Sequence, residues 1–220
     1  MTPHQFIDIL ASLEFEDTFN PYSDRCFVHD RDDAPICRRN ALQSILEVAV
    51  EREVDAMWIG RDLGYRGGRR TGLALTDDLH MQAHAERWGI TIPRPTKGKV
   101  VAERTAAIIW GVLSQVELPV FLWNVFPLHP HESSEPFTNR SHNARERRVG
   151  EELLCALVKL LEPRKLIAIG NDAAKSARRI CERIHVVQVR HPSYGGQTQF
   201  RSAMRDLYSL HDREAQLQLL

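Results

Sequence analysis

"WIGRDLGYRGGRRTG" (58–72) is the stretch that decides both the fold class and the place of the candidate site. It begins inside a short apolar run, DAMWIG (55–60), which is typical of a buried parallel strand. It holds five glycines and four arginines but only one carboxylate, that of Asp62. Because the formal net charge of the chain is zero, this positive charge is local, and a local basic patch is compatible with nucleic acid as a partner. We therefore expect a strand whose carboxyl end opens into a binding loop.

The rest of the chain alternates between apolar runs and segments of helical periodicity. The other apolar runs are PVFLWN (119–124), KLIAIG (165–170) and HVVQVR (185–190). Helical periodicity occurs near residues 38–52, 101–115, 144–161, 172–182 and 199–217. This alternation predicts an α/β fold, a three-layer α/β/α sandwich with a central four-stranded parallel sheet. Two long stretches without such periodicity, 62–78 and 127–143, each follow a strand, as functional loops often do.

Length and composition favour a single domain over residues 1–220. A chain of 220 residues with 43% hydrophobic side chains buries roughly 70% of its unfolded surface in one core. The first residues, MTPHQFIDILASLEFED, are too polar for a secretory signal, and no run of about 18 apolar residues could cross a bilayer. We expect a cytoplasmic monomer with no membrane partner.

The spacing of cysteine and histidine argues against a metal or another cofactor. The chain has four cysteines but no C-x-x-C pair, so we expect reduced thiols and neither zinc nor an iron–sulfur cluster. His80 and His84 lie four apart on an expected helix, but no third ligand is evident, so we expect them on a solvated face; His129, His131 and Glu132 also suggest a metal site, which is the less favoured interpretation. The tripeptide HAE (84–86) lacks the later P-C-x-x-C of a deaminase, and no G-x-S-x-G indicates a serine hydrolase.

Polar side chains follow each of the four expected strands. The strands end in GRD (60–62), in Asn124, in GND (170–172) and in RHPS (190–193). Taken singly, each of these residues has a purely structural alternative. Asp62 could form a turn, Asn124 could form an Asx turn and His191 could be a loop residue. GND could be a glycine turn followed by the cap of a helix. Parallel strands, however, bring their carboxyl ends to one edge, where open α/β sheets bind ligands. We therefore expect an acid, an amide and an imidazole to converge there.

Three of these strand ends resemble the motifs of the uracil-DNA glycosylase superfamily. GRDLGYRGGRRTGLALT (60–76) is similar to its water-activating loop, FLWNVFPLHP (121–130) to its base-reading strand and VRHPSYGG (189–196) to its H-P-S loop. TNRSHNARERR (138–148) is similar to an N-R loop that precedes a helix in several branches. The resemblance implies a DNA repair enzyme that flips uracil out of single- or double-stranded DNA. It would then hydrolyse the N-glycosidic bond and leave an abasic site.

The resemblance implies a role for each polar strand end. Asp62 would hold the attacking water and offset the charge of the oxocarbenium ion, with Gly60 and Arg61 beside the substrate. His191 would hydrogen-bond the anion that develops at O2 of the pyrimidine. Asn124 suits recognition because a carboxamide has one donor and one acceptor, which match O4 and N3–H of uracil and mismatch the amino edge of cytosine.

The glycines and arginines of the first loop would contact the nucleotide and its phosphates. The glycines let backbone N–H groups approach the flipped nucleotide. Arg61, Arg66, Arg69 and Arg70 can pair with flanking phosphates, and so can Ser193; a solvated surface loop is the alternative. The same arginines would retain the abasic product and slow its release.

The first loop departs from the best-studied branch of the superfamily beside the base. There a proline and a tyrosine follow the aspartate, and the tyrosine blocks the 5-methyl group of thymine. In DLGY (62–65), either Gly64 leaves this gate open or Tyr65 fills it after a shift of one residue. We expect relaxed selectivity, with excision of some 5-substituted uracils. Leu75 replaces the aromatic residue that stacks on uracil, so Phe126 is the expected substitute.

A second departure concerns the residue that enters the duplex. Where the best-studied branch has a leucine after H-P-S-P, this chain has Gly195. Tyr194, Gln197 or the loop with Asn139 and Arg140 would have to fill the gap left by the extruded base. The protein inhibitor of uracil-DNA glycosylases that holds this leucine should therefore bind poorly to this chain.

Two other functions fit part of the sequence. A nucleoside- or nucleotide-processing hydrolase would keep an acid and an amide but would need no arginines that grip a duplex. A non-catalytic DNA-binding relative would keep the arginines but would not need Asp62, Asn124 and His191 together.

Overall fold

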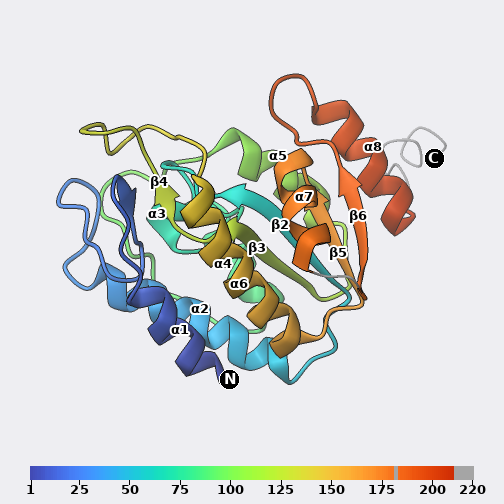
Figure 1. Ribbon diagram of the computed structural model, residues 1–220, viewed down its shortest axis with the longest axis horizontal. Coiled ribbons are helices and arrows are strands. Elements are labelled where there is room, and N and C mark those ends of the chain that lie inside the picture. Colours follow the sequence, from blue (N-terminus) through green and yellow to red (C-terminus); the bar gives the residue numbers. More distant parts are fainter. Residues whose placement is uncertain (181–182, 211–220) are drawn as a thin grey trace, which may run out of the picture.

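A four-stranded parallel sheet forms the centre of the molecule (Figure 1). The computed structural model describes residues 1–180 and 183–210. The strands of the sheet are β2 (Ala56–Asp62), β3 (Val120–Phe126), β5 (Lys165–Ile169) and β6 (His185–Val189), in the spatial order β3-β2-β5-β6. All neighbouring pairs are parallel, which confirms the predicted α/β class and the four predicted strands.

Helices connect and cover the strands. They are α1 (Pro3–Ala11), α2 (Ala34–Val50), α3 (Gly68–Thr71), α4 (Met81–Arg87), α5 (Arg104–Leu113), α6 (Ala144–Leu161), α7 (Asn171–Ile180) and α8 (Gln197–Tyr208). Strands β1 (Thr18–Phe19) and β4 (His129–Pro130) form a separate antiparallel pair. The sequence pattern predicts α2 and α5 to α8, but not α1, α3 or the β1–β4 pair. The last helix ends at Tyr208, nine residues before the predicted end, and the part of that prediction beyond residue 210 lies outside the described residues.

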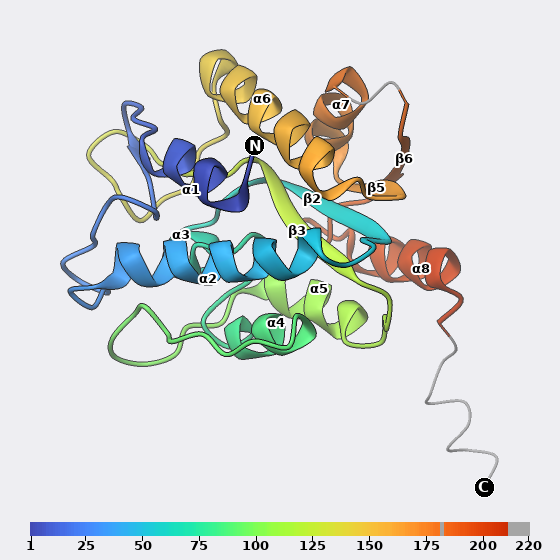
Figure 2. The same cartoon turned by 90° about the horizontal axis from the view of Figure 1, so that it is seen from below.

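The helices form a layer on each face of the sheet. Figure 2 shows α6 and α7 on one side and α5 and α8 on the other. Successive residues of a strand point to opposite faces. Accordingly, Met57 and Ile59 of β2 pack in the core cluster that includes α6 and α7, whereas Ala56 and Trp58 pack in the one that includes α5 and α8. The predicted α/β/α layering is confirmed.

The sheet opens between β2 and β5 at its carboxyl end. β2 follows β3 to its last residue, with Gly60 opposite Asn124 and Asp62 opposite Phe126. Its pairing with β5 covers residues 56–59. The chain runs from β2 to β3 on one side and later returns to β5 on the other side, so β2 and β5 flank a topological switch point. Ligands of open α/β sheets bind at such points.

A buried arginine, Arg38 on α2, anchors the loop that follows β2. Its side chain is fully buried and forms an ion pair with Asp30. Its Nε donates a 2.8 Å hydrogen bond to the carbonyl oxygen of Arg70. Gly72, which has a left-handed φ of 71°, lies so close that an added Cβ would be 2.8 Å from Cβ of Arg38. The conformation of the loop therefore depends on a helix that precedes β2 in the chain.

Three cysteines are free thiols, and no helix is suited to cross a membrane in the part of the chain that the structure describes. Cys26, Cys37 and Cys155 are free, and Cys181 lies outside the described residues. Across residues 1–180 and 183–210, no helix combines the length and the apolar character needed to cross a bilayer.

Arg38→Met should destabilise the fold strongly, because it leaves the Asp30 carboxylate buried without its cation. Removing one partner of a buried ion pair typically costs about 3–5 kcal/mol. The control is Arg164→Met, whose ion pair with Glu53 is exposed and should change the free energy of unfolding by about 1 kcal/mol or less. Urea unfolding measures both variants, and equal losses would contradict the anchoring role of Arg38.

Candidate active site

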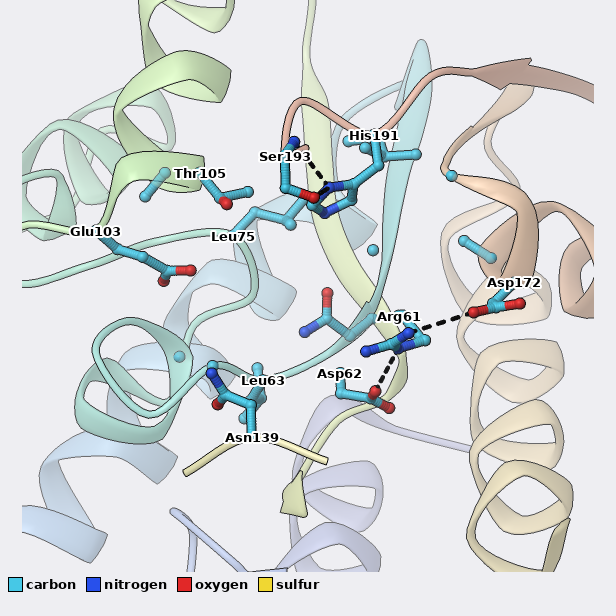
Figure 3. Close-up of a pocket in the computed structure, with 18 of the residues that line it drawn as sticks. Arg61, Asp62, Leu63, Leu75, Glu103, Thr105, Asn139, Asp172, His191 and Ser193 are labelled. Atoms are coloured by element: carbon cyan, nitrogen blue, oxygen red, sulfur yellow. Dashed lines mark hydrogen bonds and ion pairs between the residues drawn. The ribbon is translucent and has the colours of Figure 1, made fainter. Parts of the chain in front are cut away.

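A cavity of about 580 Å³ opens at the carboxyl end of the sheet, at the switch point between β2 and β5 (Figure 3). Its wall comes from segments that are far apart in the chain: residues 60–64, 68, 75, 103, 105–106, 124, 139–140, 169–173, 190–191 and 193–194. All four strands of the main sheet or the residues directly after them contribute. The volume lies within the range of small-ligand sites, about 300–1,000 Å³.

Most of the sequence-predicted site residues line this cavity. Those in its wall are Gly60, Arg61, Asp62, Gly64, Leu75, Asn124, Asn139, Arg140, His191, Ser193 and Tyr194. Those outside its wall are Tyr65, Arg66, Arg69, Arg70, Phe126 and Gln197. The structure therefore brings the acid, the amide and the imidazole into one cavity, as expected for the carboxyl ends of parallel strands.

The carboxamide of Asn124 reaches the cavity across Gly60 of the neighbouring strand. A Cβ at Gly60 would lie 2.4 Å from Oδ1 of Asn124 and 2.8 Å from Cδ2 of Leu75, so a side chain there would displace the amide. Asn124 is 1% exposed, and its Oδ1 has no hydrogen-bond partner within the described residues. Leaving a buried polar atom unpaired is costly and calls for an explanation. Because Asn124 lines the cavity, its carboxamide is placed at the wall that a ligand would contact.

His191 follows β6, and its ring points into the cavity (Figure 3). The backbone N–H of Ser193 donates to Nδ1 of His191 at 3.1 Å, and Oγ of Ser193 lies 2.7 Å from the same atom. Because a backbone N–H can only donate, Nδ1 is an acceptor and the neutral ring carries its proton on Nε2. Burial lowers the pKa of His191, and the charges of Arg61 and Arg190 lower it further. Ser193, expected at a phosphate, thus orients a neutral imidazole that has an N–H to donate.

Asp62 ends β2 with its side chain 7% exposed, and each of its carboxylate oxygens has a partner. Arg61 donates from Nε to Oδ2 at 2.7 Å, and Nδ1 of His142 pairs with Oδ1. Figure 3 shows Arg61 between Asp62 and Asp172, which it reaches at 3.3 Å. A carboxylate oxygen has two lone pairs, so each still has one free direction. The arrangement holds a carboxylate at a defined place in the wall.

His142 is a site residue that the sequence analysis missed. It lies in the loop before α6, its side chain is 8% exposed, and Phe126 packs against it with ring centroids 6.2 Å apart. The only pointer in the sequence is the segment 138–148, which resembles a loop of the superfamily without marking this histidine. Phe126 is fully buried and also packs against Phe15, so the prediction that it stacks on the base is wrong. Leu75 and Ile169 supply apolar wall instead.

Two of the four arginines that were expected at phosphates are structural. Arg69 and Arg70 belong to α3 and are each 4% exposed. Arg70 forms an ion pair with Asp78 at 2.6 Å, and Arg69 lies over the ring of Phe19, 3.9 Å from its centroid. The prediction that they contact phosphates is wrong, because both guanidinium groups are buried and do not reach an anion on the surface. The expected retention of the abasic product loses these two contacts as well.

The other two arginines of the loop reach solvent. The side chain of Arg61 is 41% exposed, and Arg66 is exposed. Arg66 donates from Nε to the hydroxyl of Tyr65 at 2.7 Å, and Tyr65 is not part of the cavity wall. Gly64, by contrast, is in the wall. Of the two alternatives for the gate beside the base, Gly64 is therefore the one at the cavity.

The loop with Asn139 and Arg140 is pinned by other parts of the protein. Oδ1 of Asn139 accepts a hydrogen bond from the backbone N–H of Tyr65 at 2.9 Å. Arg140 forms an ion pair with Glu146 at 2.7 Å. The hydrogen bonds from Arg140 to that carboxylate raise the pKa of the Arg140 guanidinium. Tyr194 is different: it is 98% exposed at the rim of the cavity, with a left-handed φ of 49°.

Glu103 is a second site residue that the sequence pattern does not mark. It precedes α5, and its carboxyl group points into the cavity (Figure 3). The group lies over two glycines of the first loop: an added Cβ at Gly64 would be 3.2 Å from Oε1, and one at Gly67 would be 2.0 Å from Oε2. Burial raises the pKa of Glu103 to about 7; the charge of Asp77 adds to the rise, and that of Arg66 opposes it.

Two histidines away from this cavity are structural. His84 is buried on α4 with its Nδ1 3.0 Å from Oγ1 of Thr76, and burial lowers its pKa to about 3. Burial likewise lowers the pKa of His129 to about 3, and its Nε2 lies 2.8 Å from the carbonyl oxygen of Thr138. The expected solvent-facing role is therefore wrong for His84. Among the residues that the structure describes, no group of three or more histidine, cysteine or acidic side chains could hold a metal ion.

The fold and the cavity define an α/β protein with a ligand site at the carboxyl end of its sheet. The family model of the uracil DNA glycosylase superfamily matches residues 47–209, and the chain belongs to that superfamily. Among solved structures, the crystal structure of wild-type SMUG2 from Pedobacter heparinus has the same fold. Its TM-score is 0.62, with 14% identity over 96% of this chain and 98% of that chain. No curated protein sequence matches the chain.

Gly60→Ala should disturb this site while leaving the strand in place. The added methyl group meets the amide of Asn124, and overpacking of this kind costs about 1–3 kcal/mol. The matched control is Gly111→Ala on α5, where no atom lies within 4 Å of the new Cβ and alanine should stabilise the helix by about 0.5–1 kcal/mol. Urea unfolding should thus show effects of opposite sign. Stabilisation by both substitutions would contradict the close approach at Gly60.

Proposed function

We propose that this protein is a monofunctional DNA glycosylase that removes uracil from single- or double-stranded DNA and leaves an abasic site. Membership of the superfamily supports a DNA glycosylase. The observation that supports uracil as the substrate is the unpaired carboxamide of Asn124. It shares a cavity with the neutral ring of His191 and the carboxylate of Asp62. The wall of the described cavity includes no lysine that could form a Schiff base, which favours hydrolysis by water.

The amide of Asn124 suits uracil and disfavours cytosine. Its Oδ1 would accept from N3–H of uracil, and its Nδ2 would donate to O4. Cytosine presents an acceptor at N3 and a donor at N4, so both hydrogen bonds would be lost. Because the amide is buried, a mismatched base leaves polar groups unpaired, which discriminates far more strongly than shape alone. The base must first leave the helical stack, since the duplex covers this edge.

His191 would stabilise the charge on the departing base. As the bond between C1′ and N1 breaks, its electron pair moves into the pyrimidine, and negative charge gathers at O2. The Nε2–H of His191 would donate to that oxygen, and the contact with Ser193 keeps the ring in the required tautomer. Loss of one such donor lowers kcat roughly 100- to 1,000-fold in other enzymes.

Asp62 would stabilise the sugar and hold the attacking water. The departing base leaves an oxocarbenium ion, whose positive charge a nearby carboxylate offsets. The oxygen of water bonds to C1′, and the proton it loses passes to Asp62 or to solvent late in the reaction. Arg61 and His142 each occupy one lone pair of the carboxylate and keep it in place. His142 would therefore act as a positioning residue for Asp62.

The cavity would accept more than unsubstituted uracil. Gly64 forms the wall where a tyrosine would block a substituent at C5, which supports excision of some 5-substituted uracils. Leu75 would pack on the base in place of an aromatic ring. Its left-handed φ of 55° and a 3.1 Å hydrogen bond from Nε1 of Trp110 to its carbonyl oxygen hold it at the wall.

Several expectations stay predictions. A cytoplasmic monomer that works without a cofactor is one of them, and insensitivity to the leucine-gripping inhibitor, argued from Gly195, is another. Retention of the abasic product now depends on the solvent-exposed Arg61 and Arg66.

Wild-type protein should release uracil from a labelled oligonucleotide, with abasic sites revealed by alkaline cleavage. Asp62→Asn should lower kcat roughly 100- to 1,000-fold, because an amide has no charge to offset the oxocarbenium ion. The matched control is Asp32→Asn, whose carboxylate is 91% exposed and pairs with Arg25; its activity should equal that of the wild type.

Three outcomes separate the proposal from its alternatives. Failure of the wild type to cleave uracil-containing DNA would defeat the glycosylase proposal. Release of uracil from free deoxyuridine alone would favour a nucleoside hydrolase. Binding of DNA without cleavage would favour a non-catalytic relative.

We also propose that Tyr194 fills the gap that the flipped nucleotide leaves in a duplex. It follows the H-P-S loop, stands at the rim of the cavity and is 98% exposed. The other candidates are less suited, because Asn139 and Arg140 are held by hydrogen bonds to neighbouring segments and Gln197 lies outside the wall.

Tyr194→Ala should lower kcat/KM on a duplex roughly 10- to 100-fold, because aromatic stacking on a base is worth about 1–3 kcal/mol. Activity on a single strand should stay unchanged, since no partner base has to be replaced. The control is Leu118→Ala, an exposed apolar residue that precedes β3 and so lies at the opposite end of the sheet. Equal losses on duplex and single strand would contradict this role of Tyr194.

A further inference from the structure

Glu103 is held at the cavity wall through its backbone. Its N–H donates to Oδ2 of Asp77 at 2.6 Å. Asp77 is fully buried, and its Oδ1 lies 3.0 Å from the backbone nitrogen and 2.6 Å from Nδ1 of His80. The start of α5 is thereby fixed, and the side chain of Glu103 extends into the cavity beside Thr105 and Ala106.

The carboxyl group of Glu103 has space but no partner. Gly64 and Gly67 provide the space, since a side chain at either position would crowd its oxygens. In the part of the chain that the structure describes, neither oxygen forms a hydrogen bond or an ion pair. Glu103 is only partly exposed, and its carboxyl group faces the cavity, where a ligand would replace the solvent around it. Its position at the cavity therefore points to the ligand as its partner.

The base that this cavity would bind has one polar position left over. In the proposed function, Asn124 takes N3–H and one lone pair of O4, and His191 takes O2. The second lone pair of O4, next to C5, is free. We propose that Glu103 is a second base-reading residue, whose carboxyl group donates a hydrogen bond to O4 as the neutral acid and repels O4 as the carboxylate. The inference rests on the proposed function and extends it to the C5 side of the base.

The protonation state of Glu103 follows from its surroundings. Burial raises its pKa to about 7, with Asp77 adding to the rise and Arg66 opposing it. The other charged or histidine side chains of the wall are Arg61, Asp62, Arg140, Asp172, Arg190 and His191. The acid predominates below about pH 7 and the carboxylate above it. Affinity for uracil should therefore fall as the pH rises through this value.

The test compares the KM of the wild type and of Glu103→Gln for a uracil-containing single strand across neutral pH. The wild-type KM should rise roughly tenfold from acid to alkaline conditions, as expected for loss of one hydrogen bond and gain of a repulsion. Glu103→Gln should keep a low KM throughout, because its amide always has an N–H to donate. The matched control, Glu117→Gln, changes an exposed residue just beyond α5 and should behave like the wild type. The kcat values are compared separately, since Asp62 and His191 act on that step.

A second variant and a stability measurement complete the test. Glu103→Ala has no donor and should show the high KM at every pH. A pKa raised in the folded state favours folding of the acid form, so the wild type should lose thermal stability relative to Glu103→Gln as the pH rises from about 4.5 to 7. Absence of uracil release by the wild type would refute the proposed function. Uracil release with a wild-type KM that does not change with pH, or a Glu103→Gln variant that keeps the dependence, would refute this inference alone.

Discussion

The cavity depends on one close approach, that of the Asn124 carboxamide to a backbone without a side chain at Gly60. The parallel register of β2 and β3 sets these two residues opposite each other. A shift of one residue would turn Asn124 to the other face of the sheet, because side chains alternate along a strand. The pairing of β2 with β5 ends at Ile59, so the cavity opens beyond that point. Strand order, strand length and one glycine thus act together to place the amide in the cavity wall.

Desolvation gives the two ends of the cavity different charges. It lowers the pKa of His191, which keeps the imidazole neutral near pH 7, and it raises the pKa of Glu103 to about 7, where the acid and the carboxylate are equally populated. Asp62 is nearly as shielded from solvent, and its carboxylate pairs with Arg61 and His142. In the proposed function, a neutral imidazole and, below about pH 7, a neutral carboxyl group face the base, and the carboxylate of Asp62 faces the sugar. Such a division suits a reaction that separates an anion from a cation.

The first loop owes its shape to buried ion pairs. Arg38 pairs with Asp30 and Arg70 with Asp78, and both guanidinium groups are almost completely buried. Desolvation offsets much of the attraction in such pairs, so their main effect is to require a particular arrangement of the chain. In this protein they hold the glycines of the loop beneath Glu103. Positive charge that resembles a DNA contact in the sequence thus serves to keep the loop in place.

The four strands, most of the helices between them and the meeting of Asp62, Asn124 and His191 could be predicted from the amino-acid sequence. Those features follow from apolar runs and from the rule that parallel strands end at one edge, both of which can be read locally. Which polar residues are buried, and which partners they have, follows from the three-dimensional packing and could not be predicted. His142 lies 80 positions from the Asp62 that it contacts, and the glycines beneath Glu103 are likewise distant in the chain. Burial and pairing depend on neighbours in space, so an arginine that holds a loop and one that meets solvent have the same appearance in the sequence.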